Sequence, residues 1–276
     1  MQAWVYGHVF KPEDYLAWNG ALTLKLLACV IGIALVSYFL GSVNSAIILT
    51  KVVYGEDIRQ KGSGNPGMTN VMRTYGWLPA LITLIGDMLK CMLSMYLGVV
   101  LWGMNGAYLA GFFCIIGHIV PVLYKFKGGK GVASAFMFIL CIDVWAFIML
   151  GLTFILLVWV TRYLSLGSVV TAMVMPLMLH RMMERFTQIE VQNLSFLRLM
   201  LALIIGGIIV YKHRANILRI RDKTESRFSF KKTVRKEDLV EAEKSAELPE
   251  IAEEEDSEEV RARKEMNRKK SAKKKK

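Results

Sequence analysis

The polar segment GEDIRQKGSGNPGMTNVMR, residues 55–73, combines glycines, amides and basic side chains between two long apolar runs. Glycine lets a backbone turn tightly and brings its N–H groups close to a ligand. Successive N–H groups in such turns form an anion-binding hollow, to which a nearby Lys or Arg adds full positive charge. The segment therefore indicates a phosphate or carboxylate site. The plainer alternative is a flexible interhelical loop whose glycines only separate the helices.

Two further polar segments have the same character. Residues 125–131, KFKGGKG, precede an apolar run, so their N–H groups would open onto a helix N-terminus. They are not a Walker A motif, because its glycine spacing and the Ser or Thr after the lysine are missing. Residues 212–225, KHRANILRIRDKTE, begin where an apolar run ends, and His213 and Asn216 share a helix face. The alternative for this third segment is a basic collar that stops membrane transfer.

The elements that position these segments are predicted to be membrane helices. Apolar runs in residues 1–220 reach about 20 residues, the length that crosses a bilayer as a helix. That part contains only eight acidic residues, whereas residues 221–276 alternate acid and base. We expect a membrane-embedded domain in residues 1–220. We expect residues 221–276 to be a charged cytoplasmic tail, disordered or a solvated helix.

The apolar pattern predicts an all-α polytopic integral membrane protein with about seven transmembrane helices. Asp143 divides a run of thirty residues, and a carboxylate costs far less at an outer turn than at the bilayer centre. That run is therefore expected to form two short helices. The expected spans are residues 24–50, 75–101, 107–124, a pair within 132–161, 166–180 and 196–211.

Loop charges predict the orientation. With seven spans, the three polar segments and the tail lie on one side, which carries most of the loop lysines and arginines. Basic loops mark the cytoplasmic side, so the N-terminus is expected outside and the C-terminus inside. A five-span version with re-entrant segments keeps this orientation. The basic excess lies at membrane edges, and we expect no nucleic-acid partner.

Asp87 and Lys90 share a helix face inside the second expected span. An ion pair inside a bilayer indicates either a functional site or a structural lock between helices, and the sequence leaves both open. His118, close to Pro121, is expected to be structural.

Four segments together resemble, in order and spacing, the motifs of the bacterial acyl-phosphate:glycerol-3-phosphate acyltransferase family, also called PlsY. They are GSVNSA, DIRQKGSGNPGMTNVMR, GHIVPVLYKFKGGKGVAS and HRANILRIRDKTE, and the resemblance covers about residues 24–226. It implies a multi-pass enzyme of the bacterial plasma membrane whose active site faces the cytoplasm. Such enzymes transfer an acyl group from acyl phosphate to glycerol 3-phosphate, which gives lysophosphatidic acid and phosphate in the first step of phospholipid synthesis.

The resemblance also implies roles for individual residues, divided among its three main motifs. The expected catalytic residues are Arg73, Lys130, His213 and Asn216. The expected substrate-binding residues are Ser63, Asn65, Thr69 and Asn70 in the first motif, Lys127, Gly128, Gly129 and Gly131 in the second, and Glu225 in the third. The proton of the attacking hydroxyl would go to His213 or to a substrate phosphate oxygen.

The chain departs from the family pattern at four positions. Ser134 replaces a threonine, and Cys91, Met137 and Lys223 each replace a glycine. Because Lys223 carries a side chain, the turn before Glu225 is expected to differ.

The main rival function is a small-anion transporter, but the chain shows no internal repeat and its polar loops gather on one side. Asp57, Asp87 and Asp143 are isolated, so we expect no metal and no other cofactor. No HxxxxD pattern occurs, which argues against the acyl-CoA-dependent acyltransferases. The expected partners are acyl phosphate, glycerol 3-phosphate and membrane lipid, with the enzyme that makes acyl phosphate as a candidate.

Overall fold

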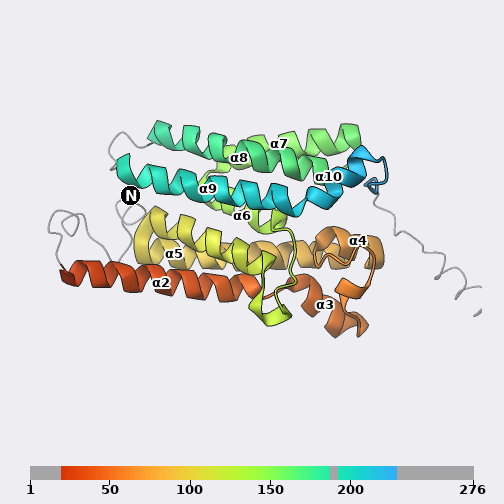
Figure 1. Cartoon of the computed structure of the whole chain (residues 1–276), viewed down its shortest axis with the longest axis horizontal. Coiled ribbons are helices and arrows are strands. Elements are labelled where there is room, and N and C mark those ends of the chain that lie inside the picture. The colour runs from red at the N-terminus through yellow and green to blue at the C-terminus, as the bar shows by residue number, and fades with distance from the viewer. Residues whose placement is uncertain (1–19, 187–191, 229–276) are drawn as a thin grey trace, which may run out of the picture. The chain divides into compact units, whose positions relative to one another are not determined.

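The computed structural model describes residues 20–186 and 192–228, and all regular structure in these ranges is helical. The all-α prediction is confirmed there, and the predicted tail beyond Phe228 lies outside the described residues. The helices are α2 (Gly20–Ser42), α3 (Ser45–Tyr54), α4 (Met68–Tyr75), α5 (Trp77–Ile119), α6 (Val132–Ile142), α7 (Val144–Thr161), α8 (Leu164–Phe186), α9 (Gln192–Lys212) and α10 (Arg214–Arg221), with 3-10 turns η2 (Ile58–Gln60) and η3 (Val122–Tyr124) (Figure 1).

Several of these helices have the length and apolar surface that a membrane requires. By length and composition, four segments of the described chain can cross a bilayer: Leu22–Tyr54, Trp77–Tyr124, Val144–Thr161 and Leu164–Arg181. A fifth is added if Phe196–Lys212 and Arg214–Arg221, which are bent by 50°, count as one span. Large apolar side chains face outward along them, such as Trp159 at 73% exposure and Leu152 at 62%. Such surface is stable against lipid rather than water.

Helix α5 is two antiparallel arms joined by a tight turn. Trp102 and Gly103 have non-helical backbone angles, and φ of Gly103 is +57°. A Cβ on Gly98 would overlap the carbonyl of Gly106, whereas a continuous helix would separate these residues by about 12 Å. Lys90 likewise meets His118, 28 positions further along. The chain thus reverses between the predicted spans 75–101 and 107–124.

Helix α2 packs closely on the second arm of α5. A Cβ on Gly41 would overlap the Cys114 carbonyl, and one on Gly117 would overlap the Tyr38 carbonyl. Small residues allow membrane helices to approach this closely. The Tyr38 hydroxyl donates to the Val120 carbonyl at 2.8 Å and holds α2 to the end of α5.

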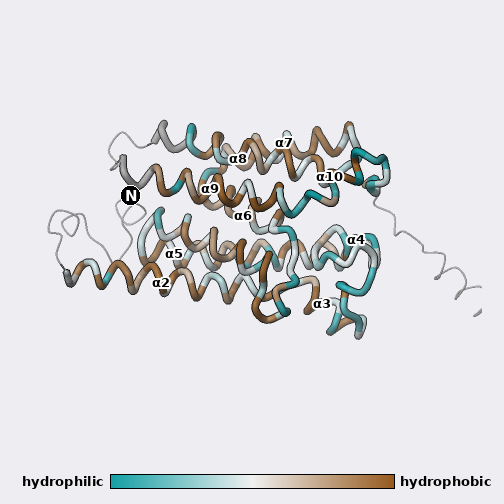
Figure 2. The backbone as a smooth tube through the Cα atoms, viewed as in Figure 1, coloured by the Kyte–Doolittle hydropathy of each residue, from teal (hydrophilic) through white to brown (hydrophobic). Residues whose placement is uncertain are grey.

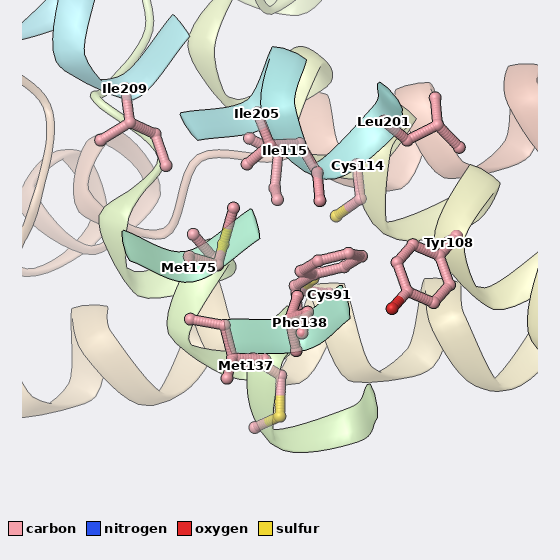
Figure 3. Packing of buried hydrophobic residues seen from close by; sticks show 14 of the residues in the cluster. Cys91, Tyr108, Cys114, Ile115, Met137, Phe138, Met175, Leu201, Ile205 and Ile209 are labelled. Atoms are coloured by element: carbon pink, nitrogen blue, oxygen red, sulfur yellow. The ribbon is translucent and has the colours of Figure 1, made fainter. Parts of the chain in front are cut away.

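The core lies where α6 meets α5, α8 and α9 (Figure 3). Phe138 of α6 is fully buried, and its ring meets Tyr108 of α5 edge to face at 5.4 Å between centroids. Asp143 ends α6 and caps α7 by accepting a hydrogen bond from the Ala146 N–H at 2.6 Å. The predicted division of residues 132–161 into two helices is therefore confirmed. With 11 residues, α6 is about 16 Å long and shorter than a full span.

The hydrophilic residues of the described helices and loops gather at one end of the bundle, around α3, α4 and α10 (Figure 2). The chain beyond α10 stays packed there, since the Phe228 N–H donates to the Arg162 carbonyl at 2.6 Å. The three polar segments singled out in the sequence lie at this end.

Candidate active site

The glycine loop, residues 55–67, is shaped by the side chain of Asn70. This amide is 1% exposed, accepts a hydrogen bond from the Ser63 N–H at 2.9 Å, and donates to the carbonyls of Ile58 (3.2 Å) and Lys61 (2.9 Å). Gly62 has φ +56°, and a Cβ there would overlap the Asn70 oxygen. Asn70, predicted to bind substrate, is therefore placed beneath the loop, where it fixes the loop backbone.

A second buried amide holds the other end of the glycine loop. Asn44, fully buried in the break between α2 and α3, accepts from the Ile47 N–H at 3.0 Å and so caps α3. Its amide nitrogen donates to the Pro66 carbonyl at 3.2 Å. The sequence signal for this role was an amide within an otherwise apolar span.

Residues 125–131 are called the lysine loop. Arg59 connects the glycine loop to Tyr124, the residue that precedes the lysine loop. The guanidinium forms a two-pronged ion pair with Asp57, with a shortest separation of 2.6 Å. It also donates to the Tyr124 carbonyl at 3.0 Å. The hydrogen bond from Arg59 lowers the pKa of Asp57 and keeps this pair ionised. Sequence reasoning missed Arg59 as a bridge between the two loops.

The lysine loop is pressed against the end of α5. A Cβ on Gly128 would overlap the His118 carbonyl, and one on Gly129 would overlap the His118 ring. The Gly129 N–H donates to the same carbonyl at 3.1 Å. Gly131, at φ +83°, begins α6. These glycines allow close backbone packing, and their predicted contact with phosphate stays a prediction.

Lys130 meets the third polar segment in a chain of hydrogen bonds. Its ammonium donates to the Asn216 oxygen at 2.6 Å, and the Asn216 amide donates to Glu225 at 2.6 Å. Glu225 also accepts from the Ser165 hydroxyl at 2.6 Å and from the Arg219 guanidinium at 2.8 Å. The structure therefore brings the lysine loop, α8, α10 and the segment after α10 together. Three predicted site residues, Lys130, Asn216 and Glu225, are direct neighbours.

The polar cluster formed by Lys130, Asn216, Arg219 and Glu225 carries more positive than negative charge. Burial lowers the pKa of Lys130 to about 8, although the charge of Glu225 opposes this, and the charges of Arg219 and Arg73 add to it. Burial also lowers the pKa of Arg73, which feels Glu225 and Arg219 as well. Arg73 thus lies within electrostatic reach of the cluster. Half-buried cations that outnumber the nearby carboxylate favour an anionic ligand.

Glu225 remains ionised inside this cluster. Burial alone would raise its pKa, but hydrogen bonds from Ser165, Asn216 and Arg219 more than offset burial and hold the pKa below its usual value. Glu225 is therefore a fixed negative charge that orients Asn216 and Arg219.

His213 lies at the bend between α9 and α10 and is 2% exposed. Its Nδ1 is 2.8 Å from the Ile209 carbonyl, which can only accept a hydrogen bond. Nδ1 must therefore carry a proton, so in the neutral ring Nε2 presents a lone pair. This is the tautomer that a general base requires.

Lys223 adopts a left-handed backbone, with φ +56°. The turn before Glu225 is closed by the N–H groups of Thr224 and Glu225, which donate to the Arg219 carbonyl at 2.8 and 3.1 Å. A lysine thus occupies a conformation that glycine adopts more easily.

The remaining predicted residues lie on the two loops with unused polar groups. The side chains of Ser63, Asn65 and Thr69 make no hydrogen bond to the described part of the chain, and Ser63 is exposed. Lys127 is exposed and has no ion-pair partner among residues 20–186 and 192–228. In the same ranges, no three His, Cys, Asp or Glu side chains gather as a metal site would require.

A family model and individual related sequences match the chain, and all of them are glycerol-3-phosphate acyltransferases. A family model described as glycerol-3-phosphate acyltransferase matches residues 31–223. The glycerol-3-phosphate acyltransferase of Finegoldia magna is 37% identical over 198 residues, which cover 71% of this chain and 94% of that protein. The one of Carboxydothermus hydrogenoformans is 37% identical over 199 residues, with coverage of 72% and 96%.

Two crystal structures of PlsY, an integral membrane glycerol 3-phosphate acyltransferase, are also similar. The glycerol 3-phosphate form has a TM-score of 0.64 at 29% identity and covers 72% of this chain and 96% of its own. The lysophosphatidic acid form has a TM-score of 0.62 at 27% identity, with coverage of 73% and 96%. By sequence match and by fold, the chain belongs to the glycerol-3-phosphate acyltransferase family.

Proposed function

We propose that the protein transfers a fatty acyl group from acyl phosphate to the 1-hydroxyl of glycerol 3-phosphate. The observation that carries the proposal is the meeting of Lys130, Asn216 and Glu225 from separate segments, within electrostatic reach of Arg73. Both substrates carry phosphate, and the cluster offers cations and amides at the polar end of a lipid-facing bundle. The family match supports the same acceptor, and it gives no support to a transporter.

The glycine loop and Arg73 are proposed to hold glycerol 3-phosphate. The free side chains of Ser63, Asn65 and Thr69 supply polar contacts, and Arg73 supplies charge. The lysine loop, with Lys127 and Lys130, is proposed to hold the phosphate of the donor. The N–H groups of Ser63 and Gly129 are already paired within the protein, so the loop N–H groups that remain unpaired would add anion donors.

An apolar groove next to Lys130 is proposed to take the acyl chain. Its walls come from α6, α8 and α9, and Val132, two residues after Lys130, is among the residues that line it. Ile209 also lines it, and the carbonyl of Ile209 accepts the hydrogen bond of His213. A chain in this groove would bring its carbonyl carbon to the polar cluster.

The chemistry needs little beyond alignment, because an acyl phosphate is already activated. The hydroxyl oxygen of glycerol 3-phosphate bonds to the acyl carbon, and the bond from that carbon to the phosphate oxygen breaks. Phosphate leaves with the electron pair, and the hydroxyl proton passes to His213 Nε2 or to a phosphate oxygen. Arg73, Lys130 and the loop N–H groups stabilise the charge on the leaving phosphate.

We infer a seven-crossing arrangement made of α2, the two arms of α5, and α6 to α9, with the N-terminus outside and the C-terminus cytoplasmic. The reversal of α5 at Gly103 supports the count, although α6 alone is shorter than a full span. The basic loops at the polar end support a cytoplasmic active site in the plasma membrane. An enzyme that makes acyl phosphate must then supply the donor on that side.

The donor is tested by incubating purified protein with glycerol 3-phosphate and either palmitoyl phosphate or palmitoyl-CoA. Lysophosphatidic acid is expected only with palmitoyl phosphate. Its formation from the CoA ester alone would overturn the assignment of the donor.

A further inference from the structure

A buried charge triad supports the two loops, and its residues are not among those proposed to bind either substrate. Asp87 and Lys90 lie on the first arm of α5, and His118 lies on the second. The three are 2%, 8% and 4% exposed. Lys90 forms an ion pair with Asp87 at 2.8 Å, which confirms the pairing expected from their spacing.

Lys90 uses its ammonium group in three directions at once. Besides Asp87, its Nζ lies 2.9 Å from Nδ1 of His118 and donates to the Val43 carbonyl at 2.7 Å. An ammonium can only donate hydrogen bonds, so Nδ1 of His118 must accept, while Asp87 is held to Lys90 by charge. One side chain thus links both arms of α5 to the break between α2 and α3.

Two of these three contacts, those with Val43 and His118, lead directly to a loop. Val43 precedes Asn44, whose side chain holds Pro66 of the glycine loop. His118 supports the lysine loop, because Gly129 rests on its ring and donates to its carbonyl. Lys90 is therefore connected to the glycine loop through Val43 and Asn44, and to the lysine loop through His118.

We propose that Lys90 is a positioning residue for acyl transfer, which keeps the glycine loop and the lysine loop in register. The inference rests on the proposed function, in which each loop holds one substrate. If each loop keeps its own shape, each substrate still binds when Lys90 is lost. Only the alignment of hydroxyl and acyl carbon, which depends on both loops, is disturbed.

A stabilising role alone does not account for the triad. Replacing a buried ion pair by apolar or neutral groups of similar volume is often neutral for stability. Such groups lack a donor that can reach both the Val43 carbonyl and Nδ1 of His118. Small misplacements of reacting groups matter, since about 1 Å can cost about 100-fold in rate.

The first test compares the double variant Asp87→Asn/Lys90→Met with Arg198→Met. The double variant leaves no unpaired buried charge. Arg198 is a matched control: it is 3% exposed, donates to Asn105 at 2.8 Å, and lies about 21 Å along α9 from Lys212. We expect kcat of the double variant to fall about 100-fold with unchanged KM for both substrates. Arg198→Met should keep its kcat even where its unfolding temperature falls.

A pair of variants at His118 tests the same link without changing a charge pair. Asn can place an amide oxygen where Nδ1 accepts from Lys90, whereas Leu cannot. His118→Asn is expected to retain most of the turnover that His118→Leu loses. This pair decides the question if the double variant does not fold.

The outcomes separate the two claims. A wild-type protein that forms no lysophosphatidic acid would refute the proposed function itself. An active wild type whose double variant keeps its kcat, or loses it only in step with Arg198→Met, would refute the positioning role. Equal losses in His118→Asn and His118→Leu would refute it as well.

Discussion

Lys130 and Asn216 are 86 positions apart in the chain, yet the ammonium of one donates to the amide oxygen of the other at 2.6 Å. This contact joins the lysine loop to α10 and, through Asn216, to the carboxylate of Glu225. The amide thus links a cation and an anion through two hydrogen bonds. Lys130 keeps its charge available for a phosphate group, while Glu225 is occupied by other donors.

The first prediction concerns pH. Burial lowers the pKa of Lys130 to about 8, so Lys130 is charged below pH 8 and loses its proton as the pH rises through this value. We expect kcat/KM for acyl phosphate to fall above about pH 8. Lys130→Arg, which stays charged, should remove this alkaline limb whatever its absolute rate. An unchanged limb in the variant would show that another group titrates.

The second prediction concerns Asn70. Its three hydrogen bonds to the glycine loop are worth about 1 kcal/mol each, so Asn70→Ala should loosen that loop. Since about 1.4 kcal/mol is a tenfold change, we expect KM for glycerol 3-phosphate to rise at least about tenfold. KM for acyl phosphate should change little. Thr74→Val is the control, because Thr74 donates only to the Asn70 carbonyl within α4. Equal effects on both substrates would argue against the division of the loops.

The third prediction concerns the left-handed turn at Lys223. A side chain at this conformation costs roughly 1 kcal/mol, which glycine avoids. Lys223→Gly is expected to raise the thermal unfolding temperature of the detergent-solubilised protein. Lys223→Ala keeps the Cβ and should not. If both variants behave alike, the backbone strain at this position is negligible.

The fourth prediction concerns His213. If Nε2 takes the hydroxyl proton, His213→Gln should bind both substrates normally and lose turnover by about 100-fold or more. Binding is measured by calorimetry with glycerol 3-phosphate and turnover by phosphate release. Retained turnover would assign the proton to a phosphate oxygen of the substrate.

Much of the helical layout followed from the sequence. Apolar runs gave the helices, and the cost of a buried carboxylate predicted the break at Asp143, where that side chain caps α7. The turn near Gly103 and the Asp87–Lys90 pair followed from local spacing. These features depend on residues close together in the chain, which is why pattern alone predicts them.

The roles of the glycines and amides in the site did not follow from the sequence. Gly128 and Gly129 were expected to serve phosphate, but their lack of a Cβ is first required by His118, which lies on another segment. The predicted ligand Asn70 and the unassigned Asn44 both hold the glycine loop from below. Arg59 and Lys90 connect segments through contacts that span dozens of residues. Such contacts depend on tertiary packing, which no local pattern encodes.

The central claim is tested most directly by measuring phosphate and lysophosphatidic acid together. Purified wild-type protein and the variant Lys130→Met are incubated with palmitoyl phosphate and glycerol 3-phosphate. We predict equal molar amounts of both products from the wild type, no phosphate release without glycerol 3-phosphate, and a loss of both products in the variant. Phosphate release without lysophosphatidic acid, or undiminished product from Lys130→Met, would contradict a transfer site built on the Lys130–Asn216 contact.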